Sequence, residues 1–267
     1  MKKRDIALMV FILVLVFCTQ SLAVVPEDID SKNISKGIIG ARYLSAGTQK
    51  IKMQIALNDK VYNYDILDPA TFDYFPTQMG NGTYKTKILE NVVNNKYMVK
   101  SQQDITIDIK DDKTVYLNSI QNIEWSNDTK AVAKAKELVK GIKTDAEKVT
   151  KIHNWIAANI VYDTKKIKDL PSTYIPNVDD TLKTKKGICY DYSALFASML
   201  RSQGIPAKLV MGYTKNADVY HAWNEVYMSK TKTWVTIDTT FSAAYKQAKR
   251  PFKMIQDSKL YTASKKY

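Results

Sequence analysis

Residues 45–111 alternate between apolar and polar side chains, which is the pattern of β-strands that bury one face. In the run IKMQIAL, residues 51–57, every second side chain is apolar, and Asn58-Asp59 then predicts a turn. The following run, VYNYDI, should return beside the first and place Tyr62, Tyr64 and Ile66 opposite Ile55, Met53 and Ile51. Residues 79–112 predict three more short strands, with turns at Gly80-Asn81-Gly82 and Asn94-Asn95.

These strands predict a small all-β domain, arranged as a sandwich, that precedes the helical part of the chain. We place this domain at residues 24–112. It contains no cluster of side chains with an evident chemistry, so we interpret it as a structural or positioning module.

From about residue 129 the apolar pattern takes on the period of a helix. The run TKAVAKAKELVKG predicts an amphipathic helix that ends at Gly141, and a second helix should begin at a capping box formed by Thr144 and Glu147. The apolar stripe of this second helix comprises Val149, Ile152, Ile156 and Ile160. His153 lies off the stripe, so we expect it to face solvent. Residues 165–182 contain two prolines and predict a loop that leads to the next helix.

The next helix begins at Cys189, the only cysteine beyond the first 23 residues. Unpaired N–H groups at a helix N-terminus carry a partial charge of roughly +0.5, which favours a thiolate there. Lys185 and Lys186 act in the same direction, whereas Asp191 opposes them. The alternative is that Cys189 is a small buried residue without chemistry, since cysteine is among the most buried residue types. Its position in the helix does not decide between the two.

The chain has only two histidines, His153 and His221, and the second of these opens a predicted strand, HAWNEVYM. A second strand, TWVTID, follows after residues 229–232 and ends at Asp238. If the turn is centred on residues 229–230, His221 stands directly opposite Asp238 on one face of the hairpin. A nucleophilic thiol needs a base and a group that orients the base, and Cys189, His221 and Asp238 supply that set.

Three segments, GICYDYSALFASMLRSQGIPAKLVMGY, HAWNEVY and WVTIDTTF, resemble the transglutaminase-like superfamily in its bacterial branch, which includes cysteine proteases. They match the Gly-x-Cys helix, the His-Ala-Trp strand and the Asp-x-Thr strand of that family, in the same order. The resemblance covers roughly residues 131–241 and implies that Cys189 is the nucleophile, His221 the base and Asp238 the residue that orients the imidazole. Tyr190 stands where the animal cross-linking enzymes have tryptophan, and no calcium loop of the EF-hand type is evident.

The N-terminus adds a prediction about location. Residues 1–23 combine a basic start, an apolar run and the sequence Ser-Leu-Ala, which together indicate a signal peptide. Cys18 follows the bulky Phe17, which disfavours lipidation at that cysteine. We therefore expect a secreted or extracytoplasmic protein of the cell envelope that meets the membrane only through its signal peptide. The net charge of +13 would otherwise suggest a nucleic-acid partner, but export argues against one. An anionic envelope polymer and plain solvation remain open for the basic surface.

The sequence as a whole predicts an α+β fold, with a papain-like transglutaminase core at residues 113–267 in which the cysteine helix packs on an antiparallel sheet. The resemblance implies a thiol acyl-transfer enzyme that attacks an amide of a protein or peptide substrate and forms a thioester, with no cofactor. The Cys189 N–H should hold part of the oxyanion, and Tyr162 is our guess for the second donor. The alternative is a non-catalytic envelope-binding protein on the same scaffold. A zinc site would need Cys189 and both histidines from separate segments, which we do not expect.

Overall fold

The computed structural model of this 267-residue chain describes residues 28–44, 47–68 and 70–267. The predicted signal peptide and Cys18 therefore lie outside the described residues. Across these three ranges, no helix combines the length and the apolar character that crossing a membrane requires.

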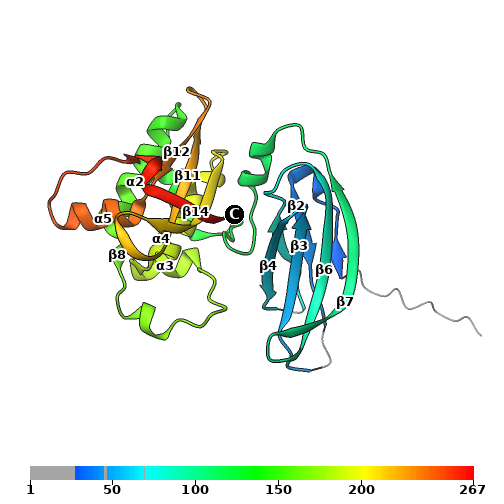
Figure 1. The fold of residues 1–267 in the computed structure, drawn as a ribbon. Coiled ribbons are helices and arrows are strands. Elements are labelled where there is room, and N and C mark those ends of the chain that lie inside the picture. Colours follow the sequence, from blue (N-terminus) through cyan, green and yellow to red (C-terminus); the bar gives the residue numbers. More distant parts are fainter. Residues whose placement is uncertain (1–27, 45–46, 69) are drawn as a thin grey trace, which may run out of the picture.

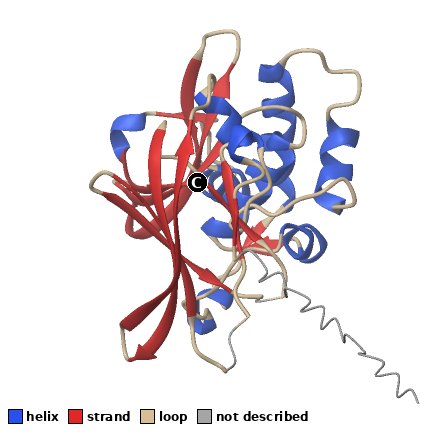
Figure 2. Ribbon diagram, turned by 90° about the vertical axis from the view of Figure 1, so that its right-hand side faces the viewer, coloured by secondary structure: helices blue, strands red, loops and turns tan. Residues whose placement is uncertain are grey.

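The N-terminal part consists of two antiparallel sheets, with strand orders β4-β3-β6-β7 and β1-β2-β5 (Figures 1 and 2). The strands are β1 (Ile29–Asp30), β2 (Ile38–Ala41), β3 (Ile51–Leu57), β4 (Lys60–Ile66), β5 (Asp73–Pro76), β6 (Gly82–Val93) and β7 (Lys96–Ile107). The predicted pairing of the first hairpin is confirmed, because Ile51 pairs with Ile66, Met53 with Tyr64 and Ile55 with Tyr62. Asn58 adopts a positive φ of 52° in its turn, as the tight hairpin requires.

The prediction of three short strands in residues 79–112 is wrong. The structure forms two strands of 12 residues each, β6 and β7, joined at Asn94-Asn95. Two irregularities in their register, near Leu89 and Asn91, interrupt the apolar alternation and so make one long strand resemble two short ones in the sequence.

The C-terminal part places helices against a five-stranded antiparallel sheet of order β13-β12-β11-β10-β14 (Figure 1). The helices are α1 (Lys130–Leu138), α2 (Asp145–Asn159), α3 (Val178–Thr184), α4 (Cys189–Arg201) and α5 (Thr239–Gln247), with short 3-10 helices η2 (Asp112–Leu117), η3 (Lys166–Asp169) and η4 (Ser258–Leu260). The strands are β8 (Val161–Tyr162), β9 (Lys186–Gly187), β10 (Ala207–Thr214), β11 (Ala217–Met228), β12 (Thr233–Ile237), β13 (Ile255–Gln256) and β14 (Tyr261–Lys266). The predicted α+β class is confirmed: α4 is buried along nearly its whole length between the sheet and the other helices.

The C-terminal segment, which is rich in lysine and aromatic residues, forms an edge strand of this sheet. β14 pairs antiparallel with β10, and the neighbouring Tyr267 is only 5% exposed. The pairing depends on Gly212, because a Cβ there would lie 2.1 Å from the backbone oxygen of Thr262. No larger residue would fit at that position.

Arg201 holds three separate segments together at the end of α4. Its guanidinium is buried and donates to the backbone oxygens of Ala207 at 2.9 Å, Asn118 at 2.7 Å and Tyr267 at 3.0 Å. The N-terminal part also touches this region, since the Tyr62 hydroxyl accepts from the Lys266 N–H at 3.3 Å. The C-terminus therefore packs against both parts of the chain.

The expectation that His153 faces solvent is wrong. The stripe of α2 is buried as predicted, but His153 is also fully buried, between the rings of Phe196 and Phe252. Its Nε2 lies 2.8 Å from the Ser242 hydroxyl of α5. The helix is covered on two sides, by α4 and by α5, so a residue outside the narrow apolar stripe is still enclosed.

Burial should make His153 a source of acid sensitivity. Burial, the largest influence, lowers the pKa of His153 below its ordinary value, although the hydrogen bond with Asn154 opposes the change. In the unfolded chain, His153 has an ordinary pKa of about 6.5 and is protonated as the pH falls through that value, while the buried His153 of the folded chain stays neutral. The free energy of unfolding should therefore drop by up to about 1.4 kcal/mol per pH unit.

Urea unfolding between pH 5 and 7.5 measures this slope. We expect His153→Gln to flatten it relative to wild type, while His221→Gln leaves it at least as steep, because the raised pKa of His221 contributes a slope of opposite sign. Equal slopes for wild type and His153→Gln would contradict the assignment.

Candidate functional site

Cys189 is the first residue of α4, and a short parallel bridge fixes the segment that precedes it. β8 pairs with β9, with Tyr162 level with Gly187. The N–H of Asp163 donates to the Gly187 oxygen at 2.9 Å. Cys189 is partly exposed and forms no disulfide. The thiol therefore stands at a helix N-terminus where a reactant can reach it.

The sequence suggested that the charge of Asp191 opposes a thiolate at Cys189. In the structure, the Asp191 carboxylate is not an unpaired charge. It is fully buried, and its Oδ2 accepts from the Ile188 N–H at 2.8 Å and from the Lys166 ammonium at 2.8 Å. Tyr174 donates to its other oxygen. The carboxylate thus ties the loop before α3 to the start of α4, and Lys166 balances its charge.

His221, on the hairpin strand β11, is only 5% exposed, and Asp238 is fully buried. The Nε2 atom of His221 lies 2.8 Å from Oδ2 of Asp238. The second imidazole nitrogen, Nδ1, is then available to Cys189, whose thiol also interacts with this ring. The structure therefore brings together the three residues that the sequence singled out.

The hairpin turn is not centred on residues 229–230, the condition under which His221 and Asp238 would stand directly opposite each other, although the two residues are in contact. Met228 pairs with Thr233 and Asn224 with Ile237, so the turn lies one residue later than assumed. Asp238 consequently comes level with Trp223, and it reaches His221 as a diagonal neighbour on the same face. Such a contact lies within reach of a long or aromatic side chain.

Asp238 has a second role, since it is also the N-cap of α5. Its Oδ1 accepts from the backbone N–H groups of Thr240 and Phe241, both at 3.1 Å. Its Oδ2 accepts a further bond from the Tyr261 hydroxyl at 3.2 Å. The side chain thus serves as a helix cap and as the partner of His221 at once.

The protonation of His221 follows from these contacts. Burial by itself would lower its pKa, but the hydrogen bonds to Asp238 and Cys189 outweigh burial and raise the pKa of His221 above its ordinary value. The imidazole is therefore held in its charged form at neutral pH. The ring of Phe241 covers it, with 5.0 Å between the centroids.

Tyr162, the guessed second donor of the oxyanion site, lies against Cys189. Its hydroxyl interacts with both the backbone N–H and the thiol of Cys189. Burial and the neighbouring Cys189 raise the pKa of Tyr162 to about 12, so the hydroxyl keeps its proton at neutral pH.

Two further polar residues, Asn224 and Tyr261, support the site, and the sequence did not identify either of them. Asn224 is fully buried in β11, and its amide donates to the oxygens of Ser193 in α4 and Lys208 in β10, both at 3.0 Å. It therefore fixes α4 against the strand that carries His221. Tyr261 comes from β14, which lies outside every motif we recognised. A polar residue at an inward-facing position of a strand was the available signal for Asn224; no local signal marked Tyr261.

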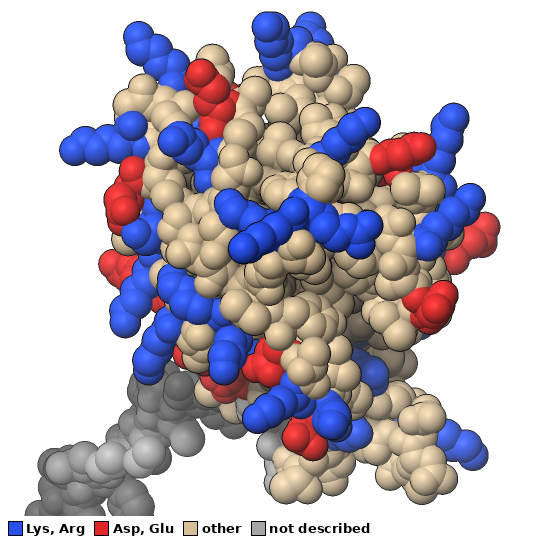
Figure 3. All heavy atoms as spheres, turned by 90° about the vertical axis from the view of Figure 1, so that its left-hand side faces the viewer, with Lys and Arg blue, Asp and Glu red and all other residues tan. Residues whose placement is uncertain are grey.

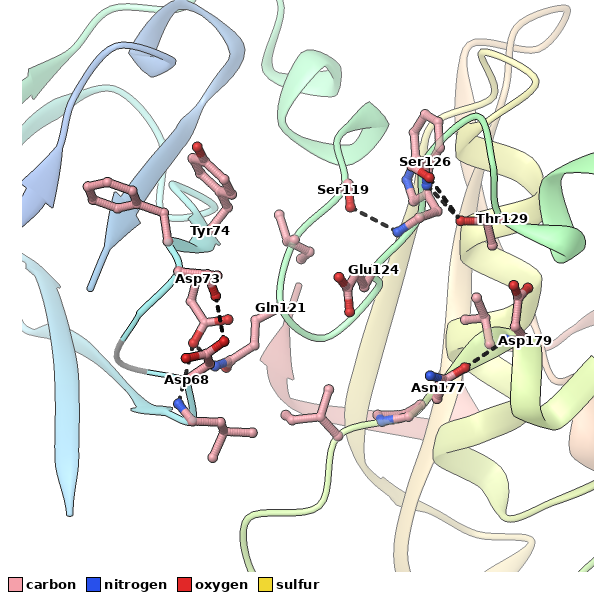
Figure 4. A pocket seen from close by; sticks show the side chains of 18 residues that line it. Asp68, Asp73, Tyr74, Ser119, Gln121, Glu124, Ser126, Thr129, Asn177 and Asp179 are labelled. Atoms are coloured by element: carbon pink, nitrogen blue, oxygen red, sulfur yellow. Dashed lines mark hydrogen bonds between the residues drawn. The ribbon is translucent and has the colours of Figure 1, made fainter. Parts of the chain in front are cut away.

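Figure 4 shows a cavity between the N-terminal sheets and residues 119–129 and 175–179. This cavity has a volume of about 780 Å³, and its polar side chains include Asp68, Asp73, Glu124 and Asp179. None of the three residues of interest lines it. A smaller cavity of about 460 Å³ is closer, since Phe241, which covers His221, forms part of its wall together with Tyr245 and Phe252.

Figure 3 shows Lys and Arg spread widely over the face of the C-terminal part, with Asp and Glu more sparse. Across the described ranges, no group of three or more His, Cys, Asp or Glu side chains is arranged to hold a metal ion.

Comparison with known proteins finds a family model that matches this part of the chain. The model of the transglutaminase-like superfamily matches residues 132–239. The chain is 33% identical over 112 residues to the uncharacterized protein YebA of Bacillus subtilis (strain 168), a match that covers 35% of this chain and 15% of that protein. It is 36% identical over 87 residues to the protein-glutamine gamma-glutamyltransferase of Pseudomonas aeruginosa, which covers 28% of this chain and 13% of that enzyme.

Both curated relatives are thus much longer than the segment they share with this chain. Among solved structures, that of a candidate cysteine protease from Cytophaga hutchinsonii is 17% identical, covers 76% of this chain and 74% of its own, and has a TM-score of 0.42. The segment that matches the model of the transglutaminase-like superfamily, residues 132–239, is the one that holds Cys189, His221 and Asp238.

Proposed function

We propose that the chain is a thiol acyl-transfer enzyme in which Cys189 is the nucleophile, His221 the acid and base, and Asp238 the orienting carboxylate. The observation that carries this proposal is the buried hydrogen bond of 2.8 Å between His221 and Asp238, beside a thiol at a helix N-terminus. Members of the superfamily include transferases and cysteine proteases, and the geometry fits the chemistry that they share.

In the proposed first step, the Cys189 thiolate attacks the carbonyl carbon of an amide. A C–S bond forms, and the carbonyl electrons move to the oxygen, which becomes an oxyanion. The Cys189 N–H and the Tyr162 hydroxyl are the donors available to that oxygen. His221 then gives its proton to the departing nitrogen as the C–N bond breaks, which leaves a thioester on Cys189.

In the second step, water or an amine attacks the thioester. His221 takes a proton from the incoming group, and the C–S bond breaks to restore the thiolate. Water yields a hydrolase, whereas a lysine amine yields a cross-link. The similarity to the protein-glutamine gamma-glutamyltransferase of P. aeruginosa supports transfer to an amine as one outcome. Hydrolysis and transfer would use the same three residues.

The substrate we propose is a protein or peptide of the cell envelope. A signal peptide at residues 1–23 would export the chain, and the basic surface would favour an anionic envelope polymer over a cationic partner. We propose no nucleic-acid partner and no cofactor.

A non-catalytic envelope-binding protein on the same scaffold is the alternative. A binding protein has no need for a partly exposed thiol beside a buried imidazole and carboxylate. Retention of all three favours the enzyme, and thiol reactivity separates the two.

We expect His221→Ala to slow alkylation of Cys189 by iodoacetamide at pH 7 by on the order of tenfold, because the thiolate loses its imidazolium partner. His153→Gln is the matched control, since it changes the only other histidine, and its rate should stay near wild type. Equal rates for wild type and His221→Ala in folded protein would contradict the pairing.

We expect Asp238→Asn to reduce turnover by about 10²–10³, less than the roughly 10⁴ of a serine triad because a thiol is easier to ionise. Asparagine caps helices as well as aspartate does, so α5 should persist and the melting temperature should change little. Without the carboxylate the raised pKa of His221 falls, and the alkaline limit of activity should move toward neutral pH.

Melting temperature and initial rate on the same preparation check this expectation. If Asp238→Asn lowers the melting temperature but keeps full specific activity, Asp238 acts only as a helix cap and the proposed role in the site is wrong.

The products distinguish hydrolysis from transfer. Envelope peptides that contain glutamine and lysine, incubated with the enzyme, should show by mass spectrometry either joined peptides that have lost ammonia or an amide replaced by an acid. We expect both products to disappear in Cys189→Ala. Products that persist in that variant would contradict the proposed nucleophile.

A further inference from the structure

We propose that Tyr261, delivered by the C-terminal strand β14, is a positioning residue that acts on His221 through Asp238. The inference rests on the proposed function, because it concerns the same carboxylate and imidazole. Tyr261 lies outside residues 132–239, the segment that matches the family model, whereas Asp238 lies within it. The Tyr261–Asp238 hydrogen bond therefore joins the matched segment to a strand that the family model does not cover.

The Asp238 carboxylate is shared among four hydrogen-bond donors. Oδ1 is occupied by two backbone N–H groups at the start of α5, which fix its direction. Oδ2 accepts from His221 at 2.8 Å and from the Tyr261 hydroxyl at 3.2 Å. Tyr261 is therefore the side chain that shares with the imidazole the same carboxylate oxygen.

Tyr261 is itself held in place from several directions. Its ring packs on Trp223, with 5.0 Å between the centroids, and Trp223 in turn stacks beside His221. Its hydroxyl also interacts with Asn216 and Thr214 at the end of the β10–β11 hairpin. Thr214 is its pairing partner in β10. The hydroxyl is thus fixed by the sheet and is not a mobile surface group.

The Tyr261 hydroxyl stays a neutral donor, because burial and the nearby charge of Asp238 raise its pKa above the ordinary value. A donor on Oδ2 withdraws part of the negative charge that faces the imidazole. Without it, the whole lone-pair density of Oδ2 would be directed at His221, so the imidazolium would hold its proton more tightly. Such an imidazolium would be a poorer acid toward the leaving nitrogen.

The charged and titratable groups around His221 come from three elements. Asp238 faces it from the end of β12, Cys189 from α4, and Tyr261 reaches the shared oxygen from β14. Tyr162 of β8 acts on the pair through Cys189. Because thiol and imidazole titrate as a coupled pair, the clearest measurement removes the thiol.

The experiment is therefore an NMR titration of the imidazole of His221 in a Cys189→Ala background. The chain has two histidines, so His153→Gln identifies the second signal. We expect Tyr261→Phe to raise the pKa of His221 by roughly half a pH unit and Asp238→Asn to lower it. Tyr220→Phe is the matched control, because its hydroxyl also contacts β14, at Ser264, and it should leave the value unchanged.

With the thiol present, we expect Tyr261→Phe to lower kcat by about threefold to tenfold with little change in KM, while Tyr220→Phe stays near wild type. A His221 pKa that is unchanged or lowered in Tyr261→Phe, while Asp238→Asn lowers it, would overturn the role of Tyr261 alone. A value unmoved by Asp238→Asn would instead contradict the proposed His221–Asp238 pairing and, with it, both proposals.

Discussion

The buried hydrogen bond between His221 and Asp238 is the constraint on which the rest of the site depends. A carboxylate without exposure to water is costly unless donors surround it, and Asp238 has four: two backbone N–H groups, the imidazole and a phenol. The same contacts fix where His221 must lie, since one of its nitrogens is committed to Asp238. Asn224 and the β8–β9 bridge then bring the start of α4, and with it Cys189, to the remaining nitrogen.

This arrangement explains why segments far apart in the chain must fold together. Arg201, at the opposite end of α4 from the thiol, reaches the oxygens of Asn118 and Tyr267, and Lys266 contacts Tyr62 of the N-terminal part. The helix that carries Cys189 is therefore held at both ends. A change in the C-terminal strand can reach the site through Tyr261, without touching the three residues themselves.

The sequence was sufficient for features that depend on local pattern, and insufficient where the answer depends on a neighbouring element. Alternation predicted the first hairpin and its register, and motif order located Cys189, His221 and Asp238. The register of the hairpin that carries His221 and Asp238 depends on where its turn is centred, and the sequence of residues 229–232 does not determine that position. His153 was misread because α5 covers its face of α2, and β14 was missed because its pairing requires Gly212, more than 40 residues earlier.

In the proposed mechanism, Cys189 forms a covalent acyl intermediate with the help of His221. Acid-quenched intact-mass spectrometry after a brief incubation with an activated ester, p-nitrophenyl acetate, tests it most directly, because it needs no knowledge of the natural substrate. We predict one acetyl group on Cys189 in the wild type, little in His221→Ala and none at this position in Cys189→Ala. Equal acetylation of Cys189 in wild type and His221→Ala, or none in either, would contradict it.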